Sequence, residues 1–259
     1  MGLAFSSSFV QKDILHQDQI FLVEPRVESH QELRNQGFSW IDTSVSDAVS
    51  TCDVVILAVK PQDFYSLALA LRAFLRPSQV LVSIMAGIRI ETIEQLTGIP
   101  KIVRCMPNTP SKLGFGMTGY YSQNLNDSDL QLVKTLLEST GAAILLEDES
   151  YLNAVTAISG SGPAYFYYFL RAIVQAGKQI GLSEALAKDL ACETMLGTYH
   201  LIKNSSASFD ELIQAVASKG GTTQAALETF DLHGVSESIE KGVINAESRA
   251  WELSQNQIK

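Results

Sequence analysis

The chain has 259 residues, 46% hydrophobic and 18% charged, a composition typical of a globular protein with one or two domains. Its net charge of −9 argues against a general nucleic-acid-binding protein, because such proteins carry a basic surface patch. We expect no signal peptide and no membrane partner, since the longest apolar stretch, residues 162–182, is too polar to cross a bilayer. Three widely spaced cysteines without a CxxC pair favour a reducing, cytoplasmic location.

The first half of the sequence alternates between helical and strand-like segments. A helix is expected over residues 2–10, and strand-like segments occupy 20–23, 39–41, 53–59, 79–86, 101–106, 114–122 and 142–147. Helical patterns separate the strands at 26–36, 44–52, 62–75, 89–98 and 127–139. This alternation predicts an α/β fold, a Rossmann-like doubly wound parallel sheet.

The second half contains helical patterns alone. They run over residues 151–157, 163–180, 183–203, 208–216, 222–232 and 235–255, and Ser208 with Glu211 forms a capping-box signature. We therefore expect two domains, residues 1–148 and 149–259. The helix at 163–180 is apolar around most of its circumference, so it is either a central core helix or a helix shared between two subunits.

Ligands of open α/β sheets bind beyond the carboxyl ends of the strands, where this chain places several suggestive residues. Lys60 could face a phosphate, and Gly87 permits a close approach of ligand to backbone. The alternative is that Pro61 and Gly87 simply end strands. Glu24 ends the first predicted strand and suits the ribose of NAD, whereas Arg26 suits the 2′-phosphate of NADP, so the choice of cofactor stays open.

The glycine fingerprint that usually cradles a dinucleotide is absent from this sequence. The stretch "GFGMTGY" at 114–120 follows prolines rather than a strand, so we interpret it as a chance match. Scattered histidines exclude a recognisable zinc site, and no serine-hydrolase elbow or P-loop motif occurs. We expect no bound metal.

Two loops in the second half precede helices and could bind an anion through free backbone amides. "SGSG" at 159–162 leads into Pro163, a favoured first helical residue, and "SKGGTT" at 218–223 begins another helix. Each loop could equally be a simple connection between helices.

Five motifs together resemble one enzyme family. "AVKP", "MAG", "RCMPNTP", "AISGSGPAYF" and "SKGGTTQAAL" are similar to the corresponding segments of Δ1-pyrroline-5-carboxylate reductases, which make L-proline by NAD(P)H-dependent reduction of a cyclic imine. The resemblance runs from Met1 to about Trp251. It implies an all-helical dimerisation domain after the Rossmann-like domain, and larger rings of dimers occur in the family.

The chain departs from the family pattern at two places. Family members begin with a strand and a glycine loop, and Met1-Gly2 resembles the end of that loop, so the first strand is expected to be missing here. A start assigned too late, a truncated chain and a degenerate paralogue are the three explanations. Lys219 stands where the family usually has proline, which puts the rigidity of that loop in doubt.

The resemblance also implies roles for individual residues. Thr223 would hydrogen-bond the ring nitrogen of the imine, with Ser218 supporting its loop. The substrate would be bound by Gly220, Gly221, Thr222, Thr223 and Ser161. NADPH or NADH would be bound by Ala58, Val59, Lys60, Pro61, Ala86, Gly87, Asn108 and Arg26.

Two other functions remain open. A catalytically impaired or truncated paralogue could act as a dimeric scaffold. Another 6-phosphogluconate-dehydrogenase-like oxidoreductase would share the two-domain plan but would be expected to carry a catalytic lysine in the first helices of the second domain. Residues 151–157 and 163–176 contain no lysine, which argues against that alternative.

Overall fold

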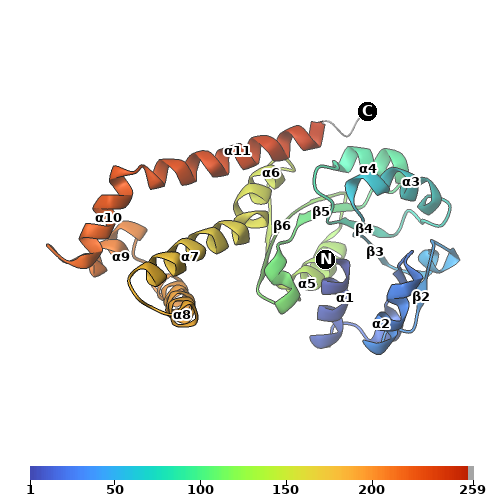
Figure 1. The fold of residues 1–259 in the computed structure, drawn as a ribbon. Coiled ribbons are helices and arrows are strands. Elements are labelled where there is room, and N and C mark those ends of the chain that lie inside the picture. Colours follow the sequence, from blue (N-terminus) through green and yellow to red (C-terminus); the bar gives the residue numbers. More distant parts are fainter. Residues whose placement is uncertain (256–259) are drawn as a thin grey trace. The chain divides into compact units, whose positions relative to one another are not determined.

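The computed structural model describes residues 1–255 (Figure 1). It divides into two compact units, which are described separately below. Met1–Ser161 and the C-terminal segment from Ala246 form the first unit, and Gly162–Asn245 form the second. The proposed boundary between residues 148 and 149 therefore differs from the limit of the compact units, and it remains a prediction.

The first unit carries all the strands of the described residues. Its main elements in chain order are α1 (Gly2–Gln11), β1 (Leu22–Val23), α2 (His30–Asn35), β2 (Ile41–Asp42), β3 (Val54–Leu57), α3 (Pro61–Leu71), β4 (Val80–Ser83), α4 (Ile90–Thr97), β5 (Ile102–Met106), β6 (Gly116–Gln123), α5 (Asp127–Glu138), β7 (Gly141–Leu145) and α6 (Tyr151–Val155). The short helix expected at 44–52 is a 3₁₀ turn, Asp47–Thr51.

The strands form two sheets, of which the larger is mostly parallel. β1 pairs with β2 in parallel, and the five-stranded sheet has the order β3-β4-β5-β6-β7. One strand departs from the predicted parallel arrangement, because β6 runs antiparallel to β5, with Met106 opposite Gly119. Residues 107–115 are too few for the crossover that a parallel neighbour requires, so the chain turns back on itself here.

β1 and β3 each have a partner strand on one side only within the described residues. The amides of Val80 and Ile84 bond the carbonyls of Asp53 and Leu57, so the backbone groups of the alternate residues in β3 point to the opposite edge. Val54, Val55 and Ile56 are correspondingly only half-buried, whereas every residue of β4 is buried. β3 is therefore an edge of the larger sheet.

Helices cover both faces of the larger sheet and form two apolar cores. On one face α1 and α5 pack on alternate strand residues such as Val82 and Val103. On the other face α3 and α4 pack on Leu81 and Ile102. This two-residue alternation is what a strand covered on both faces requires, and it confirms the doubly wound interpretation of the sequence.

The second unit is helical throughout, as the sequence predicts. It contains α7 (Gly162–Gln179), α8 (Glu184–Lys203), α9 (Phe209–Val216), α10 (Thr222–Leu232) and the first part of α11 (Val235–Gln255). The predicted capping box is present, since the Ser208 hydroxyl accepts from the Glu211 amide at 3.2 Å and the Glu211 carboxylate accepts from the Ser208 amide at 2.7 Å.

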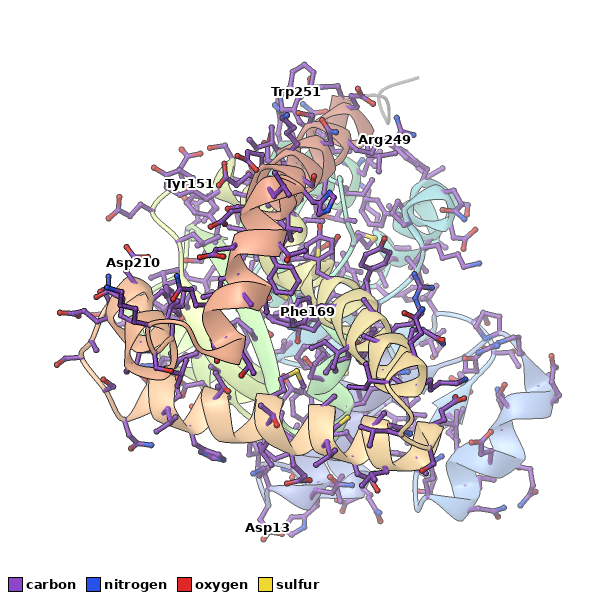
Figure 2. The ribbon with its side chains drawn as sticks, turned by 60° about the vertical axis from the view of Figure 1, so that its left-hand side comes forward. Asp13, Tyr151, Phe169, Asp210, Arg249 and Trp251 are labelled. Carbon is purple, nitrogen blue, oxygen red and sulfur yellow. The ribbon has the colours of Figure 1, made fainter. Side chains whose placement is uncertain are left out.

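α7 and α8 approach closely at small residues but leave large apolar side chains uncovered. A Cβ on Gly177 would lie 2.8 Å from the Cβ of Ala187. Phe166, Tyr167 and Tyr168 of α7 are 61%, 64% and 68% exposed, and Phe169 on the same helix is labelled in Figure 2.

Among residues 1–255, none of the helices is both long and apolar enough to span a membrane.

Candidate active site

The N-terminus of α1 lies at the carboxyl end of β3. A Cβ on Gly2 would lie 2.9 Å from the Cβ of Ala58, so the backbone of α1 touches this strand end. No side chain caps α1, and its first turn contains no acidic residue. Burial lowers the pKa of the Met1 amino group, and the positive charge of Lys112 lowers it further. Lys112 is therefore a cation near this end of the helix. Free amides and positive charge suit a phosphate.

The loops after β3 and β4 hold most of the residues predicted to bind the cofactor. Ala58 and Lys60 are exposed after β3, Val59 is half-buried, and Pro61 is the first residue of α3. After β4, Ala86 is exposed and Gly87 has a φ of +80°. A side chain at that φ would be strained, so the turn after β4 requires glycine.

Glu24 and Arg26 pair with each other just beyond β1. The guanidinium Nε donates to Oε1 of Glu24 at 2.9 Å and Nη2 donates to Oε2 at 3.0 Å. These hydrogen bonds hold the pKa of Glu24 below its ordinary value. The Arg26 side chain remains largely exposed, so the carboxylate positions the guanidinium while leaving it accessible to an anion.

Asn108 connects the end of β5 to the "SGSG" segment. Its Nδ2 donates to the carbonyl of Ser159 at 3.2 Å, and its Oδ1 accepts from the Met117 amide at 3.0 Å. A Cβ on Gly160 would lie 3.6 Å from the Cγ of Met106. The structure thus brings the π-helical turn Thr156–Gly160 against the carboxyl end of β5. Asn108 acts here as a bridge between segments of the protein.

Ser161 follows this turn directly. Its amide donates to the carbonyl of Thr156 at 2.8 Å, which closes the π-helical turn. Ser161 is the last residue of the N-terminal segment of the first compact unit, whereas the other residues predicted to bind substrate belong to the second unit.

The loop at 218–223 is held by its own polar groups. The Gly220 amide donates to Oε1 of Gln224 at 2.7 Å, and the Gly221 amide donates to the Ser218 carbonyl at 2.9 Å. Gly220 has a φ of +72°, and a Cβ on Gly221 would lie 2.5 Å from the Ser218 hydroxyl oxygen. The positive φ therefore requires glycine at position 220, whereas a side chain at position 221 would need the Ser218 hydroxyl to move. Gln224, which the sequence did not single out, fixes the loop.

The amides of Thr222 and Thr223 lie ahead of the first backbone hydrogen bond of α10. That bond runs from Ala225 to the Gly221 carbonyl at 3.2 Å. Gly221 is the N-cap residue and provides no side-chain cap. The two threonine amides are consequently available to an anion, whereas those of Gly220 and Gly221 already have partners.

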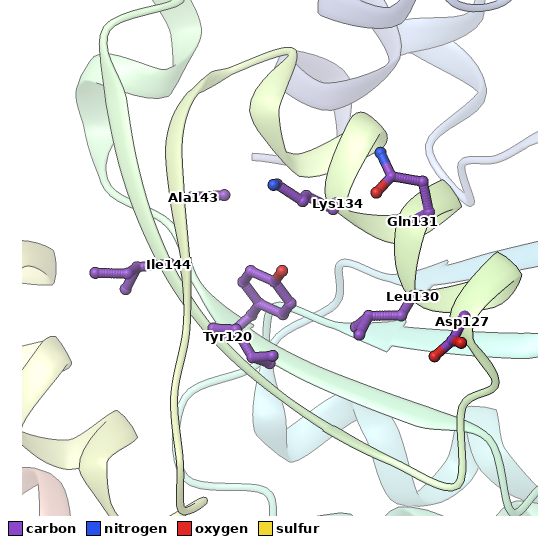
Figure 3. A pocket seen from close by; sticks show the side chains of 8 residues that line it. Tyr120, Asp127, Leu130, Gln131, Lys134, Ala143 and Ile144 are labelled. Atoms are coloured by element: carbon purple, nitrogen blue, oxygen red, sulfur yellow. The ribbon is translucent and has the colours of Figure 1, made fainter.

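The cavities of the first unit lie away from most predicted residues. The cavity in Figure 3, of about 450 Å³, lies between α5 and the strands β6 and β7, with Tyr120 pointing towards the helix, and none of the predicted site residues lines it. A second cavity of about 280 Å³ includes Met117 and Ser159, the partners of Asn108. These two cavities thus do not coincide with the strand-end loops after β3 and β4.

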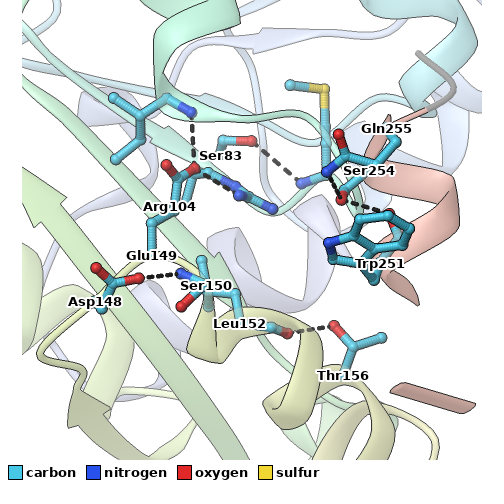
Figure 4. Close-up of polar contacts among 12 residues, drawn as sticks. Ser83, Arg104, Asp148, Glu149, Ser150, Leu152, Thr156, Trp251, Ser254 and Gln255 are labelled. Atoms are coloured by element: carbon cyan, nitrogen blue, oxygen red, sulfur yellow. Dashed lines mark hydrogen bonds and ion pairs between the residues drawn. The ribbon is translucent and has the colours of Figure 1, made fainter. Parts of the chain in front are cut away.

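An ion pair between a buried arginine and a partly exposed glutamate near these loops was not predicted from the sequence. Arg104 of β5 is 5% exposed, and its Nη1 donates to Oε1 of Glu149 at 2.6 Å (Figure 4). A charged residue inside the apolar run "KIVRCM" was the available signal, because a buried arginine needs a partner. Glu149 lies within the acidic run 147–149 and gave no such signal.

One further reactive group, the thiol of Cys105 in β5, does not suit catalysis. Burial raises the pKa of the Cys105 thiol to about 12, so this residue is not a thiolate nucleophile at neutral pH. No group of three or more histidine, cysteine, aspartate and glutamate side chains within residues 1–255 is arranged to hold a metal ion.

A mostly parallel sheet with a helix N-terminus and a glycine turn at its strand ends, together with an exposed arginine beyond the separate strand β1, defines a dinucleotide-dependent oxidoreductase of the Rossmann class. Residues 1–87 match the family model described as NADP oxidoreductase, coenzyme F420-dependent. Residues 149–253 match the model for pyrroline-5-carboxylate reductase dimerisation. The chain belongs to the pyrroline-5-carboxylate reductase family.

Similarity to individual relatives extends along both units. Pyrroline-5-carboxylate reductase of Pseudomonas aeruginosa is 37% identical over 92% of this chain and 88% of its own length, and that of Haemophilus influenzae is 34% identical over 91% and 88%. The crystal structure of the Plasmodium falciparum enzyme with NADP bound aligns with a TM-score of 0.86 at 28% identity, covering 98% of this chain and 94% of that one. The Coxiella burnetii enzyme aligns with a TM-score of 0.90 at 26% identity over the same shares.

Proposed function

We propose that this chain reduces 1-pyrroline-5-carboxylate to L-proline with NADPH, the final step of proline biosynthesis. The observation that carries the proposal is the 37% identity to a pyrroline-5-carboxylate reductase over 92% of the chain, which includes both the strand-end loops and the helical half. The reaction is the reduction of a C=N bond, and it requires a bound hydride donor and a positioned imine.

The residues at the strand ends fit a nicotinamide dinucleotide. The free amides at the start of α1 would bind the pyrophosphate, and Arg26, held by Glu24, would bind the 2′-phosphate of NADPH. Ala58, Lys60 and the turn at Gly87 would line the remaining length. When bound, the cofactor supplies the hydride. The exposed arginine supports NADPH over NADH, as does the NADP bound to the Plasmodium falciparum relative.

The substrate carboxylate is assigned to the start of α10. The amides of Thr222 and Thr223 have no helical acceptor, and the helix dipole favours an anion there. The hydroxyl of Thr223 would hydrogen-bond the ring nitrogen, while Ser218 and Gln224 hold the loop. A threonine hydroxyl is a weak acid at neutral pH, so its role is to orient the imine rather than to donate the proton outright. Ser161 is proposed as an additional substrate contact.

The helical unit is proposed to form a homodimer. Its match to a dimerisation model and its exposed aromatic residues on α7 support this arrangement, and a ring of dimers would be a further level of assembly. The three cysteines are free, which supports a reducing cytoplasm as the location.

The test is steady-state oxidation of NADPH by the purified 259-residue chain with pyrroline-5-carboxylate. We expect turnover that depends on both substrates and a lower KM for NADPH than for NADH. A chain that dimerises in light scattering but neither binds NADPH nor turns over would contradict the proposal. That outcome would support the alternative of a dimeric scaffold without catalysis.

A further inference from the structure

The carboxylate of Glu149 connects three segments of the first unit. One of its oxygens, Oε1, accepts from Nη1 of Arg104 at 2.6 Å and from the amide of Ile90 at 2.8 Å (Figure 4). Arg104 belongs to β5, Ile90 is the first residue of α4, and Glu149 itself lies in the connection between β7 and α6. A single atom therefore fixes the relative positions of these segments.

Each contact of Glu149 lies next to a loop of the candidate cofactor site. Ile90 follows the turn that contains Ala86 and Gly87. Arg104 belongs to β5 and lies shortly before Asn108, which is in the loop after that strand. The N-cap residue of α4 is Arg89, and its side chain does not cap the helix. The carboxylate of Glu149, which is distant in the sequence, caps α4 instead by accepting from the Ile90 amide. Movement of Glu149 would be transmitted to both loops.

The guanidinium of Arg104 depends strongly on this contact. Arg104 is 5% exposed, and its Nε has no hydrogen-bond partner in the described part of the chain. A buried charge that loses its counter-ion must move towards water or another acceptor. Neutralising Glu149 would therefore shift the Arg104 side chain, which belongs to β5 and lies shortly before the loop at Asn108.

The loops after β4 and β5 lie where one half of a dinucleotide would bind. In a doubly wound sheet each half binds one mononucleotide, and the strand that ends in the acidic or arginine residue lies on the adenosine side. Glu24 and Arg26 mark that side at β1, which belongs to the two-stranded sheet and not to the sheet that contains β4 and β5. The loops after β4 and β5 therefore lie on the nicotinamide side.

We propose that Glu149 is a positioning residue for the nicotinamide half of the cofactor, acting through Arg104 and the start of α4. The inference rests on the proposed function of the strand-end loops. It goes beyond that function because Glu149 is assigned no contact with cofactor or substrate, yet determines how tightly one half of the cofactor is bound.

The variant Glu149→Gln keeps an oxygen that can accept from the Ile90 amide but removes the charge opposite Arg104. We expect the Kd of NADPH, measured by fluorescence, to rise about tenfold. The Kd of 2′,5′-ADP, which carries only the adenosine half, should change by less than about twofold. In turnover, KM for NADPH should rise while kcat at saturating NADPH is largely retained.

Asp129→Asn provides a matched control. Asp129 forms a 2.7 Å ion pair with Lys101, at the opposite end of β5, and the two side chains are also partly buried. This variant should leave both dissociation constants unchanged. If Glu149→Gln fails to fold, the double variant Arg104→Met/Glu149→Leu removes both charges together and should show the same selective loss of NADPH binding.

Two outcomes would overturn the inference while the proposed function stands. Equal weakening of NADPH and 2′,5′-ADP would show a general structural role, and unchanged binding of both would show no role. A wild-type chain that binds neither ligand would instead overturn the proposed function and this inference with it.

Discussion

The two compact units bury their apolar side chains to very different extents. The first unit encloses large residues such as Phe64 and Leu81, which are inaccessible to solvent, between its sheet and flanking helices. In the second unit the buried side chains are no larger than alanine, as at Ala187 and Ala191, while four aromatic residues of α7, Phe166–Phe169, are exposed.

This difference shows that the two units obtain their stability from different sources. The first unit contains a complete core within one chain. The second presents an extended apolar surface of the kind that marks an interaction site, and it requires another surface to cover it. A second copy of the same helices is the proposed cover, so stability of the second unit should depend on protein concentration.

The largest expected effect tests the core of the first unit. Phe64→Ala creates a cavity at a site with 0% exposure and should lower the free energy of unfolding by about 3–5 kcal/mol, measured by urea denaturation. This loss should be the same at every protein concentration. Phe166→Ala in α7 is the matched control, since its effect should be small in dilute solution and grow as the concentration rises and the wild-type chain associates. Two identical, concentration-independent losses would contradict the distinction between the units.

A smaller loss is expected at the junction of β6 and β7. Gly141 has a φ of +139°, and a Cβ there would collide with the backbone of Gly116. Gly141→Ala should therefore destabilise the first unit by about 1–3 kcal/mol, seen as a lower urea midpoint. Gly242→Ala in α11 meets open space and should be neutral or stabilising by up to about 1 kcal/mol. Equal effects at both positions would contradict this steric argument.

The helical unit should nevertheless carry the substrate-binding threonine. Thr223→Ala removes the hydroxyl proposed to orient the imine and should lower kcat/KM for pyrroline-5-carboxylate about tenfold, equivalent to about 1.4 kcal/mol. The urea midpoint should hardly change, because the residue lies at the start of α10 and is only half-buried. Thr223→Ser, which keeps a hydroxyl, should retain most of the activity. An unchanged kcat/KM in the alanine variant would remove Thr223 from the mechanism.

The smallest effect concerns the pair beyond β1. Arg26 holds the pKa of Glu24 below its ordinary value of 4.5, so the pair stabilises the fold above that pH and loses this contribution as pH falls through the lowered pKa. Arg26→Gln should return the pKa of Glu24 towards its ordinary value, as followed by NMR titration. It should also raise KM for NADPH more than KM for NADH. An unshifted Glu24 titration would contradict the pairing.

The sequence predicted the fold well where the apolar pattern was strong. The buried strands β4 and β5 and the helices α5, α8 and α9 were found from periodicity and capping residues, because these signals are local. The antiparallel direction of β6 was missed because apolar content does not report strand direction. The length of the β5–β6 connection was the signal available.

The sequence allowed a location for the candidate site to be proposed, but it did not reveal most of the contacts that the structure shows there. Strand-end residues such as Lys60 and Gly87 follow from the topology alone. The hydrogen bonds of Asn108, the pairing of Glu24 with Arg26, and the contact of Glu149 with Arg104 depend on tertiary structure. The Arg104–Glu149 contact joins residues 45 positions apart, and no local pattern encodes such a pair.

The one-sided pairing of β3 has a consequence for hydrogen exchange. The amides of Val55 and Leu57 face β4 in the parallel ladder, whereas those of Val54 and Ile56 face the opposite edge. Neighbouring amides of one short strand should therefore exchange with deuterium at rates that alternate from residue to residue, slow where β4 accepts the proton and fast where solvent reaches it. The strand would show two levels of protection within four consecutive peptide groups.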